Sequence, residues 1–173
     1  QERNLIEADA SDNLEHTRFA VQAYAGLVLA RSQQAPLGSL RSLFERRSEA
    51  RSGLPLVQLA IALQLMGDAP RADQALVAGL AVTRPADEWL GDYGSPLRDQ
   101  ALILALLEEN NLMNGQREQR VFALSDQLAA SQWLSTQERN SLFLAGRGLL
   151  SQPAQPWAAQ LVRQGLALGL RTG

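Results

Sequence analysis

The sequence predicts an all-α fold in which about seven helices form a two-layer array. Four helix-like segments that are apolar nearly all the way round begin about 40 residues apart, near Asn13, Leu54, Pro96 and Thr136. Shorter segments with a single apolar stripe alternate with them. A helix that is apolar on every side must be covered on every side, whereas a helix with one stripe can face water. We therefore expect an inner and an outer layer of helices.

The first inner helix is expected to run from Asn13 to about Ser32. Residues 1–11 are polar and are expected to be frayed. The sequence DNLE at residues 12–15 has the pattern of a capping box, in which the side chains of Asp12 and Glu15 satisfy the free amides of a helix start. The residues expected to point inward are Phe19, Ala20, Ala23, Tyr24, Leu27, Val28 and Ala30.

The middle of the chain alternates between outer and inner helices. The first outer helix has apolar residues three and four apart: Leu37, Leu40, Leu43 and Phe44. Gly53 separates it from the second inner helix, residues 54–66. Gly67 suits the C-terminal cap of that helix, and Asp68 suits the N-cap of the next outer helix. The residues expected to be buried by that outer helix are Ala72, Ala75, Leu76, Gly79 and Leu80.

The longest break between helices, residues 83–94, precedes the third inner helix. Ser95 suits its N-cap and Pro96 its first position, and the helix is expected to reach Glu109. The third outer helix is expected at residues 116–132, with Val121, Leu124 and Leu128 inward. The sequence STQE at residues 135–138 is a second capping box, which opens the fourth inner helix, to about residue 150.

The pattern changes after residue 152. Pro153 and Pro156 break the helical period, and the apolar residues then alternate. We therefore divide the chain into a helical domain, residues 1–152, and residues 153–173, which are a linker or the first strands of a following β domain. The pattern does not decide between a β hairpin and a weakly ordered tail for residues 153–173. Seven helices make about half of a closed ring, so the inner helices at both ends are expected to have an uncovered side, which another segment or a second copy covers.

The composition and charge of the chain argue against several classes of partner and binding site. The chain has 173 residues, is 46% hydrophobic and carries a net charge of −2, which argues against a nucleic-acid partner. It has no cysteine and a single histidine, so we expect neither a metal site nor a cofactor. Its longest apolar run, residues 101–107, is too short for direct membrane insertion. The chain begins with Gln1, so we expect it to be a piece of a longer protein.

Three groups of side chains invite a functional interpretation, and for each we favour a structural one. His16 lies near the start of a predicted helix and is expected to be a surface or capping residue. Asp92 and Asp99 could form the carboxylate pair of a glycoside hydrolase, but their place at a helix start favours a stabilising role, with Arg98 as a partner. The aromatic residues expected to pack beneath the long break, rather than to form an exposed patch, are Trp89, Tyr93 and Trp133.

Two stretches resemble the thioester-domain region of bacterial alpha-2-macroglobulins: GDYGSPLRDQAL at residues 91–102 and WLSTQERN at residues 133–140. Residues 56–76, with the Gly67-Asp68 turn, fit the same region, and the resemblance spans roughly residues 14–152. It implies the C-terminal part of an α/α toroid, which is a ring of two concentric helix layers. The residues of these stretches that we single out as an interaction or structural motif are Asp92, Tyr93, Ser95, Arg98, Asp99, Ser135, Gln137 and Glu138.

The resemblance also implies a function. Members of this family are broad-spectrum protease inhibitors: a protease cuts a bait region, the molecule rearranges and the protease is caged. Bacterial members are periplasmic, often anchored to the inner membrane as lipoproteins, and associated with a peptidoglycan synthase. Covalent capture requires a Cys-x-Glu-Gln thioester, and this chain has no cysteine. An upstream thioester therefore stays an open question.

We expect this chain to be a non-catalytic segment of such an inhibitor. Its partners would be target proteases, met through the parent protein, and the neighbouring domains of the same chain, against which it would pack and move. The first alternative is a free-standing helical-repeat scaffold that binds a protein along its inner surface. The second is a toroidal enzyme acting on glycans through Asp92 and Asp99.

Overall fold

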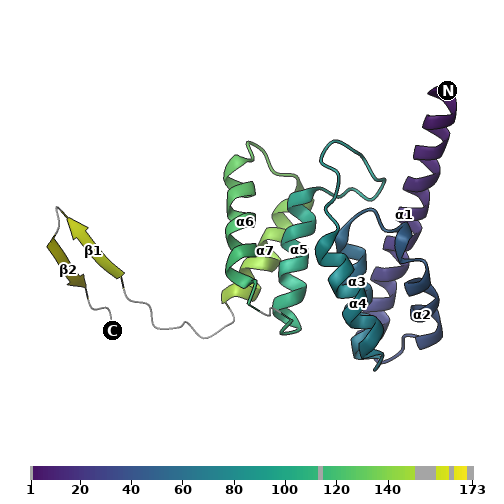
Figure 1. Cartoon of the computed structure of the whole chain (residues 1–173), viewed down its shortest axis with the longest axis horizontal. Coiled ribbons are helices and arrows are strands. Elements are labelled where there is room, and N and C mark those ends of the chain that lie inside the picture. The colour runs from purple at the N-terminus through teal and green to yellow at the C-terminus, as the bar shows by residue number, and fades with distance from the viewer. Residues whose placement is uncertain (1, 113–114, 151–158, 164–165, 171–173) are drawn as a thin grey trace.

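The computed structural model describes residues 2–112, 115–150, 159–163 and 166–170, and the side chains of residues 13–112 and 115–150 (Figure 1). Within this part of the chain, seven α-helices confirm the predicted all-α array. Their bounds are α1 Glu2–Arg31, α2 Leu37–Glu45, α3 Gly53–Leu65, α4 Ala69–Ala81, α5 Pro96–Glu109, α6 Arg117–Ala130 and α7 Thr136–Leu150, with a short 3₁₀ helix, η1 Arg47–Glu49.

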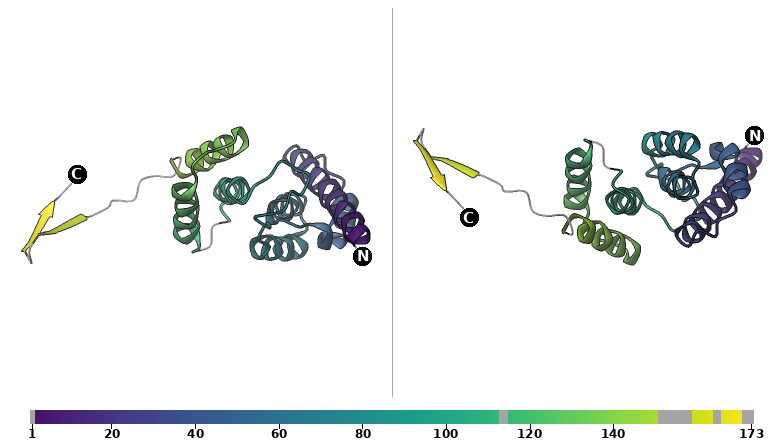
Figure 2. Two further views of the ribbon diagram at one scale, coloured as in Figure 1. Left: turned by 90° about the horizontal axis from the view of Figure 1, so that it is seen from above. Right: turned by 90° about the horizontal axis from the view of Figure 1, so that it is seen from below.

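The helices form the two predicted layers. The inner row is α1, α3, α5 and α7, each of which packs on the next. The outer helices α2 and α4 pack on α3, and α6 packs on α5. Figure 2 shows the helices from their ends, with α5 lying between the α6–α7 pair on one side and the α3–α4 pair on the other.

The centre of the core is α3. All of its residues from Gly53 to Leu63 except Gln58 are buried. One side of α3 packs with Phe19 of α1, and another packs with Ile103 of α5. Burial of one leucine side chain stabilises a fold by about 1.5–3 kcal/mol, so this one helix supplies a large share of the hydrophobic free energy. The prediction that an all-apolar segment is covered on every side is confirmed here.

The inner helices at the two ends have an uncovered apolar side, as predicted. On α1, Tyr24 is 60% exposed and Val28 is 45% exposed, so the prediction that these two residues point inward is wrong. On α7, Phe143 is 64% exposed. In the inner row, α1 packs on α3 and α7 packs on α5, so part of the apolar surface of each end helix stays in contact with solvent. Between them, the inner row borders a groove of about 1050 Å³ that Tyr24, Leu102 and Leu106 help to line.

The first helix begins much earlier than predicted, at Glu2 rather than near Asn13. Residues 2–12 contain neither glycine nor proline, so nothing in them interrupts a helix. The side chain of Asn13 does not cap a helix. Its Nδ2 donates to the carbonyl oxygen of Trp89 at 3.2 Å, and its Oδ1 accepts from Arg51 Nη1 at 2.8 Å. The capping-box pattern at residues 12–15 does not mark a helix start, because α1 continues through all four residues.

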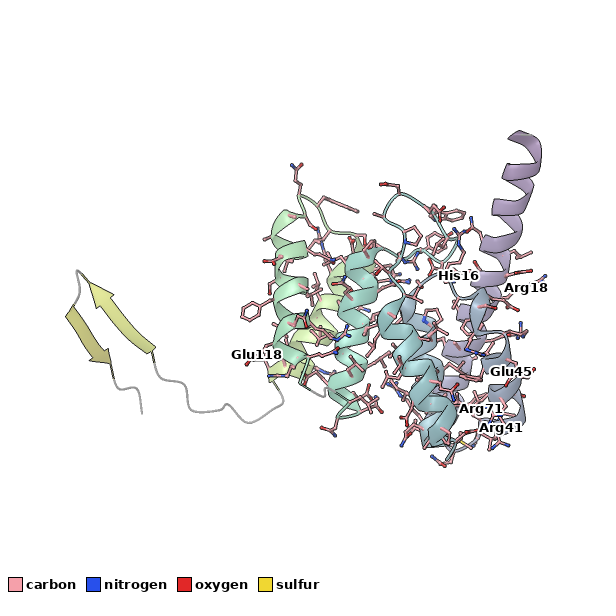
Figure 3. The ribbon with its side chains drawn as sticks, viewed as in Figure 1. His16, Arg18, Arg41, Glu45, Arg71 and Glu118 are labelled. Carbon is pink, nitrogen blue, oxygen red and sulfur yellow. The ribbon has the colours of Figure 1, made fainter. Side chains whose placement is uncertain are left out.

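The other turn residues behave largely as predicted. Gly67 has φ of 84° and ends α3, and the Ser95 Oγ accepts from the backbone N–H of Arg98 at 3.1 Å. Asp68 is an exception, because its side chain makes no cap hydrogen bond. Its Oδ2 instead accepts from Arg41 Nε at 2.6 Å and from Arg71 Nη1 at 3.3 Å, which ties α2 to α4. Figure 3 labels the two arginines, Arg41 on α2 and Arg71 on α4.

Two short strands are described beyond the helices. Strand β1, Ala159–Arg163, pairs antiparallel with strand β2, Leu166–Leu170. Among the described residues, no helix is long and apolar enough to cross a membrane.

Candidate functional site

The loop between α4 and α5 carries a buried network of charged side chains, with Arg84 at its centre. The side chain of Arg84 is only 2% exposed. Its Nε donates to Asp99 Oδ2 at 2.7 Å, and its Nη2 donates to Asp92 Oδ2. Asp92 lies in the loop and Asp99 in the first turn of α5, so Arg84 fixes the loop against the start of that helix.

A second guanidinium group completes the pairing. Arg98 Nη2 donates to Asp99 Oδ1 at 2.6 Å and to Asp92 Oδ2 at 3.2 Å, and Arg98 Nη1 donates to the carbonyl oxygen of Asp92 at 3.0 Å. Gly94 lies against both guanidinium groups, because a Cβ atom at this position would be 2.4 Å from Arg84 Nη2 and 2.4 Å from Arg98 Nη2. The positive charges of the two arginines are therefore balanced by the negative charges of the two aspartates. The guanidinium groups lie so close to Gly94 that a side chain at this position would collide with them.

His16 joins this network to α1. The residue is fully buried, so the expectation of a surface or capping histidine is wrong. Its Nδ1 accepts from the backbone N–H of Arg51 at 3.1 Å, and its Nε2 lies 3.3 Å from Asp92 Oδ2. Because Nδ1 accepts a hydrogen bond, the tautomer that fits carries its proton on Nε2 and donates it to Asp92. In Figure 3, His16 lies on the side of α1 that faces the loop.

Two further contacts hold the loop on α1. The Thr17 hydroxyl donates to the carbonyl oxygen of Leu90 at 3.1 Å, and Leu90 itself is fully buried. Arg51 lies between Asn13 and Glu88, whose Oε2 accepts from Arg51 Nη2 at 2.5 Å. The loop is thus bound by side chains from α1, from the segment before α3 and from α5.

The predicted capping box at residues 135–138 extends the network to α7. Glu138 Oε2 accepts from the backbone N–H of Ser135 at 2.8 Å, and Ser135 Oγ accepts from the N–H of Glu138 at 3.2 Å, which confirms the box. Glu138 Oε1 also accepts from the Ser95 hydroxyl at 2.6 Å, so the caps of α5 and α7 are joined. Gln137 and Tyr93 are exposed and lie outside these contacts.

The charges of the network set the pKa values of its members. Burial alone would raise the pKa of Asp92, but the hydrogen bonds from His16 and Arg84 and the charges of Arg84 and Arg98 hold it far below its ordinary value. Burial would lower the pKa of Arg84, but hydrogen bonds and charges of Asp92 and Asp99 raise it overall. Burial would raise the pKa of Glu138, but the hydroxyls of Ser95 and Ser135 and the Ser135 amide lower it.

These shifts predict the direction of a pH effect on stability. A carboxyl whose pKa is lower in the folded state stabilises the fold above its ordinary pKa, and this contribution is lost as the pH falls below that value. The ordinary values are 3.8 for Asp92 and 4.5 for Glu138. We expect the free energy of unfolding, measured with urea, to fall steeply from about pH 4.5 downward. Asp92→Asn should make this fall shallower, whereas Asp73→Asn, on the exposed side of α4, should leave it unchanged. If the free energy of unfolding falls equally steeply with pH in both variants, the attribution of this pH effect to Asp92 is contradicted.

The geometry suits a structural role and does not suit acid–base catalysis. A glycosidase needs one carboxyl that holds a proton and a second that acts on the sugar. Here Asp92 and Asp99 both accept from arginines, and the pKa of Asp92 is lowered rather than raised. Within the described part of the chain, no group of acidic residues or histidine is arranged to hold a metal ion.

The exposed aromatic residues lie outside the network. Trp89 is 69% exposed, Tyr93 79% and Trp133 73%, so the expectation that they pack beneath the long break is wrong. Trp89 and Tyr93 contact each other edge to face, with ring centroids 6.4 Å apart. The space under the loop is filled by the arginines and aspartates and by Leu90, which leaves the larger rings on the outside.

Sequence reasoning missed Arg84 and misplaced His16. For His16 a signal was available: it precedes Phe19, Ala23, Leu27 and Ala30 at spacings of three and four, so it continues the buried stripe of α1. Arg84 gives no comparable signal, because its partners are 8 and 15 residues away across a loop. Only the folded loop brings them together.

Comparisons with known proteins agree with this architecture. No protein-family model matches the chain. The alpha-2-macroglobulin of Escherichia coli K12 is 51% identical over 162 residues, which cover 92% of this chain and 10% of that protein. The native conformation of E. coli alpha-2-macroglobulin matches with a TM-score of 0.79 at 52% identity, over 86% of this chain and 10% of that one. E. coli alpha-2-macroglobulin activated by porcine elastase matches with a TM-score of 0.80 at 52% identity, over 91% of this chain and 14% of that one.

The similarity extends over nearly the whole chain in sequence and in structure, and the predicted resemblance is confirmed. The chain spans about a tenth of the length of the E. coli protein that it matches. It belongs to the bacterial alpha-2-macroglobulin family.

Proposed function

We propose that this chain is a non-catalytic helical segment of a bacterial protease trap. In this proposal residues 1–152 are the C-terminal part of an α/α toroid, and residues 153–173 lead into a following β domain. The segment packs against neighbouring domains of a longer chain and moves as one rigid body when a protease activates the molecule. The parent protein acts in the periplasm, is anchored to the inner membrane as a lipoprotein, and works beside a peptidoglycan synthase.

The observation that carries the proposal is the equal match to two states of one relative. The native and the elastase-activated E. coli proteins fit this chain equally well, at the same sequence identity. A segment whose own fold changed on activation would fit one state better than the other. The buried network supports the same view, because it joins α1, α5 and α7 through one loop and so couples both ends of the inner row.

A chimaeric protein tests the proposed function. The matching segment of E. coli alpha-2-macroglobulin is replaced by residues 13–150 of this chain, and the unmodified E. coli protein is the control. We expect porcine elastase to activate the chimaera, with the same shift in native-gel mobility and the same retention of elastase as in the control. A chimaera that is folded and intact, yet unresponsive to elastase, would contradict the proposal.

The scaffold alternative is favoured by one observation, the groove of about 1050 Å³ along the inner row. If the groove bound a separate protein, substitutions at Leu102 and Leu106 would abolish that binding and leave the elastase response of the chimaera unchanged. We place this function second. The exposed apolar residues on α1 and α7, at the two ends of the inner row, suit a segment that other parts of a longer chain cover.

A further inference from the structure

The loop between α4 and α5 exposes two aromatic side chains, Trp89 and Tyr93, which we call the aromatic pair. Both are mostly exposed, and their rings contact each other edge to face. The loop between α6 and α7, which carries the exposed Trp133, lies at the same end of the helices (Figure 1). Two of the three tryptophans of the chain thus contact solvent at one end, although burial of such a ring is favourable.

The backbone that carries Tyr93 is held in an uncommon conformation. Tyr93 has φ of 53°, in the left-handed region that residues other than glycine rarely adopt. Before it, the carbonyl oxygen of Asp92 accepts from Arg98 Nη1 at 3.0 Å. After it, the backbone N–H of Gly94 donates to Asp92 Oδ1 at 3.1 Å. Such a conformation persists only where its surroundings impose it. The buried network therefore fixes the direction in which the Tyr93 side chain leaves the loop.

The backbone at Trp89 is fixed as well. The carbonyl oxygen of Trp89 accepts from Asn13 Nδ2 at 3.2 Å. The next residue, Leu90, is fully buried, and its carbonyl oxygen accepts from the Thr17 hydroxyl at 3.1 Å. Two large exposed rings are therefore carried on a rigid base. A ring on a mobile loop must be ordered when it binds, whereas a ring that is already fixed binds without that loss of entropy.

The loop that carries the pair has little net charge. Glu88 pairs with Arg51 at 2.5 Å, and Arg84 pairs with Asp92 in the network. Of the charged residues on this loop, Asp87 alone has no ion pair within the described part of the chain. Complementary charge guides a separate molecule to its site, but a domain of the same chain is present at high effective concentration without it. The pair therefore suits an apolar surface of a neighbouring domain.

We propose that the aromatic pair is the docking site for an apolar surface of a neighbouring domain of the longer chain, in the native protein before a protease cuts it. This inference rests on the proposed function, because it requires such a domain. The chain covers 10% of the E. coli protein that it matches, so most of the surface that can reach the pair belongs to other parts of one chain. An aromatic side chain buries about 150–250 Å², and aromatic anchors dominate the free energy of many interfaces.

Hydroxyl-radical labelling read by mass spectrometry tests the docking, because the labelling rate of a side chain follows its exposure. The 173-residue chain is compared with the uncleaved chimaera. The internal control is Phe122 on α6, a ring of similar exposure outside the pair. We expect Trp89 and Tyr93 to be labelled about tenfold more slowly in the chimaera, and the rate at Phe122 to change by less than about twofold.

The outcomes separate this inference from the proposed function. If the pair is labelled as fast in the chimaera as in the 173-residue chain, the inference is overturned, and the proposed function stands as long as elastase still activates the chimaera. If the pair is protected but elastase has no effect, docking is supported and the proposed function is contradicted. Protection that arises only after elastase is added places the protease on the pair and overturns the inference, as does equal protection of Phe122.

A substitution gives a second measurement. Trp89→Ala removes an exposed ring, so the melting temperature of the 173-residue chain should change by less than about 2 °C. In the uncleaved chimaera, the same substitution should speed labelling of Tyr93 by about threefold or more, relative to the same variant of the 173-residue chain, because one of the two docking rings is gone. The matched control is Phe122→Ala. Labelling of Tyr93 that Trp89→Ala leaves unchanged, or that Phe122→Ala speeds equally, would overturn the inference.

Discussion

Asp99→Asn is expected to lower the free energy of unfolding by about 3–5 kcal/mol, because it removes one partner from a buried set of ion pairs. Asp99 is 4% exposed and accepts from Arg84 Nε at 2.7 Å and from Arg98 Nη2 at 2.6 Å. The amide keeps the shape of the carboxylate but not its charge, and its NH₂ group meets an arginine donor. Two guanidinium groups then share the single charge of Asp92 in a space with little water.

Urea unfolding followed by circular dichroism measures this effect. The control is Asp126→Asn, which changes an exposed carboxylate of α6 and should alter stability by less than about 0.5 kcal/mol. If Asp99→Asn were as mild as this control, the network would contribute nothing to the fold, and its role in joining the helices would have to be abandoned.

Gly53→Ala is expected to cost about 3 kcal/mol, because the first turn of α3 packs against the last turn of α4 through backbone atoms. A Cβ atom at position 53 would lie 2.1 Å from the carbonyl oxygen of Gly79 and 3.0 Å from that of Val82. Backbone atoms cannot rotate away as a flexible side chain does. The two helices must therefore separate, and the close contact between α3 of the inner row and α4 of the outer layer is lost.

Gly38→Ala is the matched control, because no atom lies within 4 Å of a Cβ atom built there, in the first turn of α2. Alanine is the better helix former, so this variant should be as stable as the wild type or more stable, by up to about 1 kcal/mol. Thermal unfolding of both variants tests the pair. Comparable melting temperatures for Gly53→Ala and the wild type would refute the close approach of α3 and α4.

The helices could be predicted from the sequence wherever local chemistry decides them. The starts of α5 and α7 follow from Ser95 and from the capping box at Ser135, whose side chains bind backbone N–H groups at their own helix ends. The predicted start of α1 was wrong because a capping-box pattern can also occur inside a helix, and neither glycine nor proline interrupts α1 in residues 2–12. The exposure of Tyr24 was wrong because a helix at the end of a row keeps one apolar side bare.

The sequence indicated most of the residues of the candidate site on α5 and α7 but not the contact of the site with α1. Asp92, Ser95, Arg98, Asp99, Ser135 and Glu138 were singled out, and the structure brings all six into one connected set of contacts. Their link to α1 was missed, because the pairing of His16 with Asp92 depends on how the long loop folds back. No local pattern encodes a contact across that distance, whereas capping partners lie only three residues apart.

Hydrogen exchange on the chimaera, before and after elastase activation, tests the central claim that this segment is one rigid body. Amides of α3, α5 and the loop at residues 82–95 are expected to keep the same protection in both states, because under our proposal the buried network stays intact on activation. A large loss of protection in that loop on activation, while the bait-cleaved protein stays folded elsewhere, would show that the segment rearranges internally and would contradict the account.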